Sequence, residues 1–282
     1  MTVVLAAGPD RAVVVPAAGG RLGSLVAGGR ERLVERAQSG AALPAITWGS
    51  FLMAPWAGRI SDGRLDWEGE PVQLERNLAG QAIHGAVFDV PWQVEAQDGR
   101  SVELSCEIDP GRWPFGGLVR QAYRLEPGQL RIEASVRARR PMPAALGWHP
   151  WFSRAGEDVA VTVLADERLR LDSNLIPTGE RVRVDGPDDL REGPLLGDRR
   201  LDDVFVNARA PATVRWSDLE LVIEFEPPLA TVVVFTPPGS VCIEPQTAWP
   251  DAPRLAGAGI DGTGLVELRP GAALAATMTW RW

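Results

Sequence analysis

Residues 92–108 read WQVEAQDGRSVELSCEI. Polar and apolar residues alternate from Ser101 to Ile108, which is the period-two pattern of a strand with one buried face. Residues 92–96 come before this segment, and Asp98-Gly99 between the two is a strong signal for a tight hairpin turn. The stretch therefore predicts a pair of antiparallel strands.

The same pattern recurs on both sides of this hairpin. Residues 121–125 and 130–136 flank a Pro-Gly turn and predict a second hairpin. Residues 219–226 alternate over their second half, residues 231–235 are a β-branched run, and residues 272–282 end in another alternating segment. Helical periods are scarce, and 30 glycines and 24 prolines are spread along the chain. We therefore expect an all-β fold, a large antiparallel β-sandwich.

Length and charge limit the domain organisation and the partners. The 282 residues, with no repeat or linker, predict a single domain spanning 1–282, because sandwiches of this length fold as one unit. The formal net charge of −8 argues against a nucleic-acid partner and against an anionic membrane surface, since both require a basic face. The N-terminus lacks the charged region of a signal peptide, and no apolar run is long enough to span a membrane, so we expect a cytoplasmic protein.

Composition also excludes several chemistries. The chain has no lysine, which rules out Schiff-base mechanisms. Cys106 and Cys242 are too few for a disulfide framework or a metal quartet. The chain carries neither the Gly-x-Ser-x-Gly motif of a serine nucleophile nor a glycine-rich phosphate loop between a strand and a helix.

Histidine is informative because the chain has only two. His84 precedes a glycine, and His149 lies among tryptophan, proline and phenylalanine. Taken alone, each fits a turn or a satisfied core position better than a catalytic role. Two histidines without the His-x-His or His-Glu-x-x-His spacing do not predict a metal site.

The candidate carboxylates are Glu244 and Asp202. Glu244 ends an apolar strand directly before a proline, where burial would raise its pKa toward the range of a general base; a solvated strand end is an equally good interpretation. Asp202 and Asp203 are neighbours on an extended segment and point to opposite faces. We expect at most one of them to enter a pocket and the other to be solvated.

Arginine and tryptophan complete the candidate set. Arg59 follows a glycine and either caps a turn or donates a forked hydrogen bond to a ligand. Aromatic faces beside polar groups suit a sugar, which has an apolar face and a polar rim. Four of the eleven tryptophans lie beside the polar residues named above and are candidates for such a face: Trp56, Trp148, Trp151 and Trp249.

Taken together, several segments resemble the aldose 1-epimerase (galactose mutarotase-like) superfamily, in its divergent bacterial branch. They follow the family order along nearly the whole chain: Gly19-Gly20-Arg21-Leu22-Gly23-Ser24-Leu25, Gly58-Arg59-Ile60, Ile83-His84-Gly85, Gly147-Trp148-His149-Pro150-Trp151-Phe152, Leu201-Asp202-Asp203-Val204-Phe205 and Ile243-Glu244-Pro245-Gln246. The chain departs from the best-known galactose mutarotases, which carry asparagine where it has Trp148 and histidine where it has Asp203.

The resemblance implies a supersandwich with an open cleft and an enzyme that interconverts the α and β anomers of a free aldose. It implies that Glu244 is the general base and His149 the general acid of ring opening. It also implies that His84, Arg59 and Asp202 hold sugar hydroxyls, with Trp151 beside them, and that no metal or organic cofactor is required. We expect a small-molecule sugar as partner and a monomer or homodimer as the assembly.

Three alternatives stay open at this stage. A hexose-6-phosphate 1-epimerase would use the same chemistry with arginines on the phosphate, for which Arg59, Arg76 and Arg154 are candidates. A non-catalytic carbohydrate-binding protein would share the fold without the activity. A glycosidase would need a second carboxylate beside Glu244, and Asp202 is the only candidate.

Overall fold

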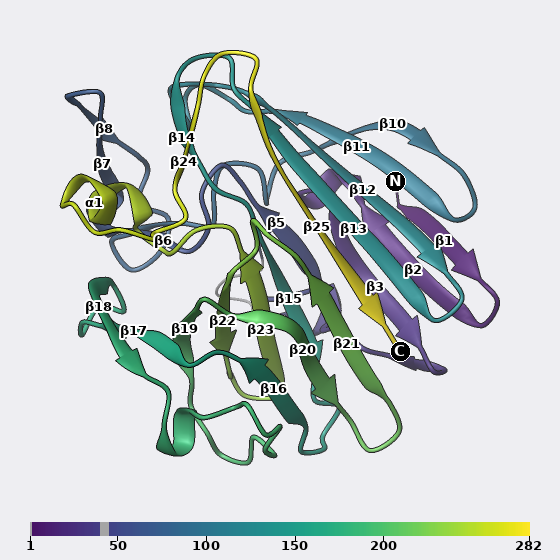
Figure 1. The fold of residues 1–282 in the computed structure, drawn as a ribbon. Coiled ribbons are helices and arrows are strands. Elements are labelled where there is room, and N and C mark those ends of the chain that lie inside the picture. Colours follow the sequence, from purple (N-terminus) through teal and green to yellow (C-terminus); the bar gives the residue numbers. More distant parts are fainter. Residues whose placement is uncertain (1, 40–44) are drawn as a thin grey trace.

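The computed structural model describes residues 2–39 and 45–282. They form two large antiparallel sheets, as Figure 1 shows. The larger sheet contains eleven strands, ordered β1 (Val3–Ala7), β2 (Asp10–Val15), β3 (Arg21–Ala27), β5 (Ser50–Met53), β15 (Gly147–Ser153), β23 (Ser240–Gln246), β22 (Thr231–Phe235), β19 (Asp202–Val206), β17 (Glu167–Leu171) and β18 (Pro177–Arg183), with β4 (Arg30–Glu31) paired to β3.

The smaller sheet contains eight strands. Their order is β10 (Gln93–Gln97), β11 (Ser101–Glu107), β12 (Leu118–Glu126), β13 (Gln129–Arg137), β25 (Ala273–Arg281), β21 (Glu220–Phe225), β20 (Arg209–Arg215) and β16 (Ala160–Leu164). The C-terminal strand β25, yellow in Figure 1, lies inside this sheet between β13 and β21.

Short elements complete the fold. The two-stranded pairs are β6 (Arg59–Ile60) with β9 (Ala82–Ile83), β7 (Arg64–Trp67) with β8 (Glu70–Gln73), and β14 (Met142–Ala144) with β24 (Val266–Leu268). The described residues contain one α-helix, α1 (Ala252–Gly257), and 3-10 turns at Pro16–Ala18, Arg36–Gln38, Ser61–Gly63 and Gly186–Asp188. None of their helices is long and apolar enough to cross a membrane.

The predicted all-β antiparallel architecture is confirmed. The hairpin of residues 92–108 is β10–β11, and the second predicted hairpin is β12–β13. The β-branched run 231–235 is β22. Alternation is clearest in strands such as β13 and β25, because one face of each is buried and the other meets solvent.

The two sheets pack through one large apolar core. Trp148 and Phe152 of β15 point into it, and the ring of Phe152 lies 5.1 Å from that of Trp280 of β25 in the other sheet. Because side chains alternate along a strand, His149 and Trp151 of β15 point the opposite way, to the outer face of the larger sheet. That face is covered too, since β15 is buried from Gly147 to Phe152. The candidate functional site lies on this outer face of the larger sheet.

Candidate active site

The register of the larger sheet brings distant residues into adjacent rows. Trp151 of β15 pairs with Cys242 of β23, and a step of two residues along each antiparallel strand puts His149 opposite Glu244. On the other side of β15, His149 pairs with Phe51 of β5. These side chains share one face because the side-chain period of a strand is two.

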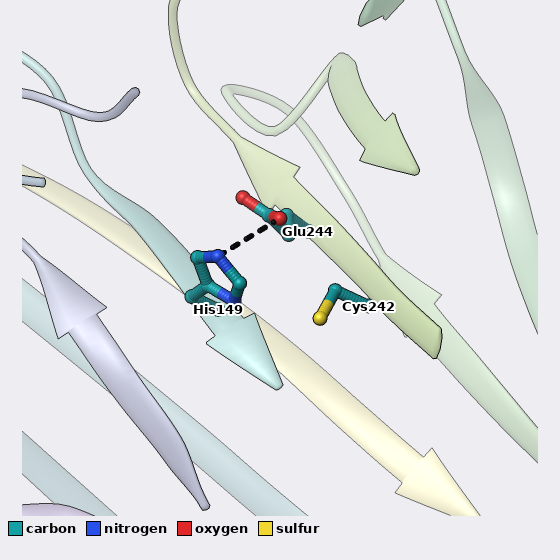
Figure 2. Close-up of side chains that lie close together, drawn as sticks. All are labelled: His149, Cys242 and Glu244. Atoms are coloured by element: carbon teal, nitrogen blue, oxygen red, sulfur yellow. Dashed lines mark ion pairs between the residues drawn. The ribbon is translucent and has the colours of Figure 1, made fainter. Parts of the chain in front are cut away.

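His149 and Glu244 are in direct contact. Figure 2 shows the imidazole of β15 reaching the carboxyl group of β23, and His149 Nε2 lies 3.2 Å from Glu244 Oε1. Both side chains are buried. Phe51 stacks on the imidazole with ring centroids 4.9 Å apart, and Gln246 donates from Nε2 to the other carboxyl oxygen of Glu244 at 3.3 Å. Packing and hydrogen bonding therefore hold both groups in place.

Burial determines the charge of this pair. Desolvation lowers the pKa of His149 from 6.5 to about 3 and raises the pKa of Glu244 well above its ordinary 4.5. Both shifts favour the neutral forms, a protonated carboxyl group beside a neutral imidazole. An imidazolium–carboxylate pair contains the same single proton. One proton transfer across the 3.2 Å contact therefore converts one form into the other.

The second histidine reaches the site from a glycine-rich turn. The amide of His84 donates to the carbonyl of Gly58 at 2.9 Å, and His84 itself has a positive φ of 67°. The next residue, Gly85, has a φ of 85°, and a Cβ there would lie 2.2 Å from the carbonyl oxygen of Ala54. Only glycine fits such a close approach of two backbones. This turn explains the His-Gly pair in the sequence.

The turn places His84 against His149. Their rings meet edge to face with centroids 4.9 Å apart, and Phe51 contacts both rings. Desolvation, with smaller contributions from the charges of His149 and Arg59, lowers the pKa of His84 well below its ordinary value. His84 is therefore a neutral hydrogen-bonding group beside the acid–base pair.

Arg59 and Asp202 form an ion pair in the cleft. Arg59 Nη2 lies 3.1 Å from Asp202 Oδ2, and both side chains are about one-fifth exposed, at 22% and 21%. Asp203 points away and pairs with Arg168 at 3.1 Å. The prediction that at most one of the two aspartates enters a given pocket holds for this cleft, but both line a second hollow beside Arg168. The prediction that the other is solvated is wrong, because Asp203 is partly buried and ion-paired.

Only one of the four candidate tryptophans lines the cleft. Trp151 does so, and its ring is stacked parallel to His149 with centroids 5.3 Å apart. The prediction is wrong for the other three. Trp56 and Trp148 lie in the core between the sheets, and Trp249 packs in a separate apolar cluster. Trp148 is adjacent to His149 on a strand, so its side chain points to the opposite face.

These residues line a cleft of about 710 Å³ on the outer face of the larger sheet. All six predicted site residues contribute to it: Arg59, His84, His149, Trp151, Asp202 and Glu244. Four buried polar atoms of the lining have no hydrogen-bond partner within the described chain: His84 Nδ1, His149 Nδ1, Trp151 Nε1 and Gln246 Oε1. Unpaired buried polar groups are costly, so these four atoms are candidates for hydrogen bonds to a polar ligand.

The sequence profile of the aldose 1-epimerase family matches residues 1–281. The chain belongs to the aldose 1-epimerase family.

Solved structures share the fold. A protein from Escherichia coli K12, provisionally described as an aldose 1-epimerase, superposes with a TM-score of 0.86 at 22% identity, covering 100% of this chain and 98% of that one. A galactose mutarotase-like protein from Clostridium acetobutylicum gives 0.85 at 18% identity, covering 99% and 94%. The family fold therefore extends over the whole described chain.

Sequence relatives include the galactose mutarotase of Sus scrofa, 31% identical over 163 residues, which are 54% of this chain and 47% of that protein. The aldose 1-epimerase of Escherichia coli K12 is 30% identical over 160 residues, 52% of this chain and 46% of that protein. The matched part of this chain thus spans about half the length of these relatives.

This member of the aldose 1-epimerase family has two further residues at the site that sequence reasoning missed. Gln246 lines the cleft and contacts Glu244, and Cys242 lies beneath it beside Trp151 and Phe51. Both are two positions from Glu244 on β23, so the period of a strand was the signal that would have found them. Cys242 also brings a thiol near His149 and Glu244, and this cluster depends on β15 and β23 being neighbours in the sheet.

Proposed function

We propose that this chain is an aldose 1-epimerase that interconverts the α and β anomers of a free, unphosphorylated aldose. The observation that carries the proposal is the 3.2 Å contact between His149 Nε2 and Glu244 Oε1 in a buried cleft. Anomer exchange requires proton transfer at two oxygens bonded to the same carbon, the ring oxygen and the anomeric hydroxyl. An acid and a base in direct contact match that demand.

In the proposed reaction Glu244 removes the proton of the anomeric hydroxyl while His149, as imidazolium, protonates the ring oxygen. The bond between C1 and the ring oxygen breaks, and the electron pair of the O–H bond becomes the second C–O bond of the aldehyde. Rotation about C1–C2 presents the other face of the carbonyl. Ring closure returns both protons, so the pair ends as it began. Positioned acid–base groups of this kind contribute about 10²–10⁴-fold to a rate.

The other cleft residues supply the hydrogen bonds and apolar contact that hold a sugar. His84 has an unpartnered Nδ1, and Arg59 and Asp202 offer a donor and an acceptor about one-fifth exposed to the cleft. Trp151 contributes an aromatic surface with an unpartnered Nε1. This mixture suits a ligand with an apolar ring face and a polar rim.

The charges favour a neutral sugar over a sugar phosphate. Arg59 is the one arginine lining the described part of the cleft, and Asp202 already neutralises it. Arg154 pairs with Asp158 at 2.7 Å, and Arg76 is exposed and donates to the carbonyl of Asp62. Neither lines the cleft. A phosphate would need unpaired arginines that converge on it.

Polarimetry of freshly dissolved α-glucose, α-galactose and α-glucose 6-phosphate tests the proposal. We expect the chain to accelerate the relaxation of at least one free sugar above the buffer rate, and that of the phosphate ester far less. Faster relaxation of the ester would favour the hexose-6-phosphate epimerase. Sugar binding without acceleration of any substrate would make the chain a carbohydrate-binding protein.

A further inference from the structure

We propose that His149, Cys242 and Glu244 form a binding site for a thiophilic divalent cation such as Zn²⁺, and that this cation and the sugar exclude each other. The ligand atoms of the three side chains all lie within 4.8 Å of one another. Figure 2 shows the thiol and the carboxyl group side by side on β23, both facing the imidazole of β15. The exclusion rests on the proposed function, whereas the cation site does not.

The geometry is close to that of a zinc site with three protein ligands. Atoms that ligate a tetrahedral zinc ion lie about 3.3–3.6 Å apart, given the usual bond lengths. His149 Nε2 and Glu244 Oε1, at 3.2 Å, already meet this spacing. No two of the three ligand atoms lie more than 4.8 Å apart, so rotation of the Cys242 side chain has to close a gap of at most about 1.5 Å. The fourth position would then point into the cleft.

The charges balance as well. Zn²⁺ with one thiolate, one carboxylate and one neutral imidazole has a net charge of zero, so the filled site avoids the cost of an uncompensated buried charge. Thiolate and imidazole select a borderline-soft cation over Mg²⁺ or Ca²⁺.

The proposed cation and the proposed reaction use the same two side-chain atoms. A cation held by the His149 nitrogen and the Glu244 oxygen occupies the lone pairs that the proposed reaction uses for proton transfer. Zinc would therefore act as a competitive inhibitor of mutarotation.

Cobalt(II) titration followed by absorption tests the site without reference to activity. We expect a thiolate-to-cobalt charge-transfer band in the wild type that zinc abolishes. The band should persist in Cys106→Ala, which removes the buried cysteine of the other sheet, and disappear in Cys242→Ala, with circular dichroism to check folding. Absence of the band in the wild type, or its survival in Cys242→Ala, would overturn the cation site.

The inhibition is then measured by polarimetry, each variant against its own zinc-free rate. Removing a ligand should raise the zinc concentration that halves the rate by at least about ten-fold in Cys242→Ala and leave it unchanged in Cys106→Ala. Equal inhibition of both variants would contradict the proposal. A chain that shows the cobalt band but no mutarotation would retain the cation site and lose the proposed function.

Discussion

Arg59 and Asp202 face each other across the cleft at 3.1 Å, one from the short strand β6 and the other from the first residue of β19. The ion pair joins the short strand β6, which lies outside the two large sheets, to β19 of the larger sheet. The two residues are 143 positions apart in the sequence. The ion pair also neutralises the one arginine of the described cleft lining, so it bears on substrate choice.

Removing the carboxylate of this pair should weaken sugar binding. We expect Asp202→Asn to raise KM for a free aldose about ten-fold, since a hydrogen bond involving a charged group contributes about 1.5–3 kcal/mol, and to lower the discrimination against the 6-phosphate. Asp203→Asn is the matched control because its carboxylate lies outside the cleft. Equal KM values for the two variants would remove Asp202 from the binding site.

Substitution of the acid should separate catalysis from binding. In His149→Gln we expect kcat to fall about 10²–10⁴-fold, since a general acid is lost, with a much smaller change in sugar affinity. Trp151 is stacked on His149, so tryptophan fluorescence reports sugar binding in the same variant. An unchanged kcat with a raised dissociation constant would mean that His149 only binds the sugar.

The turn that carries His84 should tolerate no Cβ at Gly85. Gly80 and Gly85 have nearly the same φ, +81° and +85°, but a Cβ at Gly80 meets nothing within 4 Å. We expect Gly80→Ala to cost about 1–2 kcal/mol of unfolding free energy from the left-handed backbone alone, and Gly85→Ala to cost more and to lower activity. Denaturant unfolding of the two variants checks this, and equal costs would refute the contact with Ala54.

Protonation of Asp218 should lower the stability of the folded protein in acid. Arg32, with a 1% exposed side chain, donates from both terminal nitrogens to Asp218, and this lowers the aspartate pKa from 3.8 to about 2. Because the pKa of Asp218 is lower in the folded protein, its ionised form stabilises the fold at pH values above the unfolded-state pKa of 3.8. This stabilisation is lost as the pH falls from 3.8 to about 2.

Because the Asp218 side chain is 33% exposed, screening reduces that contribution to about 1–2 kcal/mol. Thermal melts of wild type and Asp218→Asn should differ at pH 6 and converge near pH 2. Asp66→Asn, in an ion pair more than 60% exposed on both sides, is the control and should change stability by less than about 0.5 kcal/mol. A constant gap at all pH values for Asp218→Asn would contradict the assignment.

The sequence predicts the strands that have one solvated face better than those at the site. Both predicted hairpins are present, whereas β22 is buried on both faces and was predicted from its β-branched run instead of from alternation. Strand β23 is buried along its whole length and shows no alternation, so its facing residues were not apparent. Cys242 was therefore not connected with Glu244.

The composition of the cleft depends on strand order, which local patterns do not encode. His149 meets Glu244 only because β15 and β23 are neighbours in the larger sheet. Trp148 was assigned to the site by adjacency in sequence, whereas strand geometry sends it to the core. The resemblance to a family supplied the candidate set, and the register explains why its members meet.

The most direct test of the central claim is the polarimetric relaxation of an accepted sugar with wild type and Glu244→Gln. Glutamine keeps the shape of the side chain and cannot accept the anomeric proton. The account predicts that acceleration falls by at least about 10²-fold while tryptophan fluorescence still reports sugar binding. Acceleration within a few-fold of wild type would show that Glu244 is not the base.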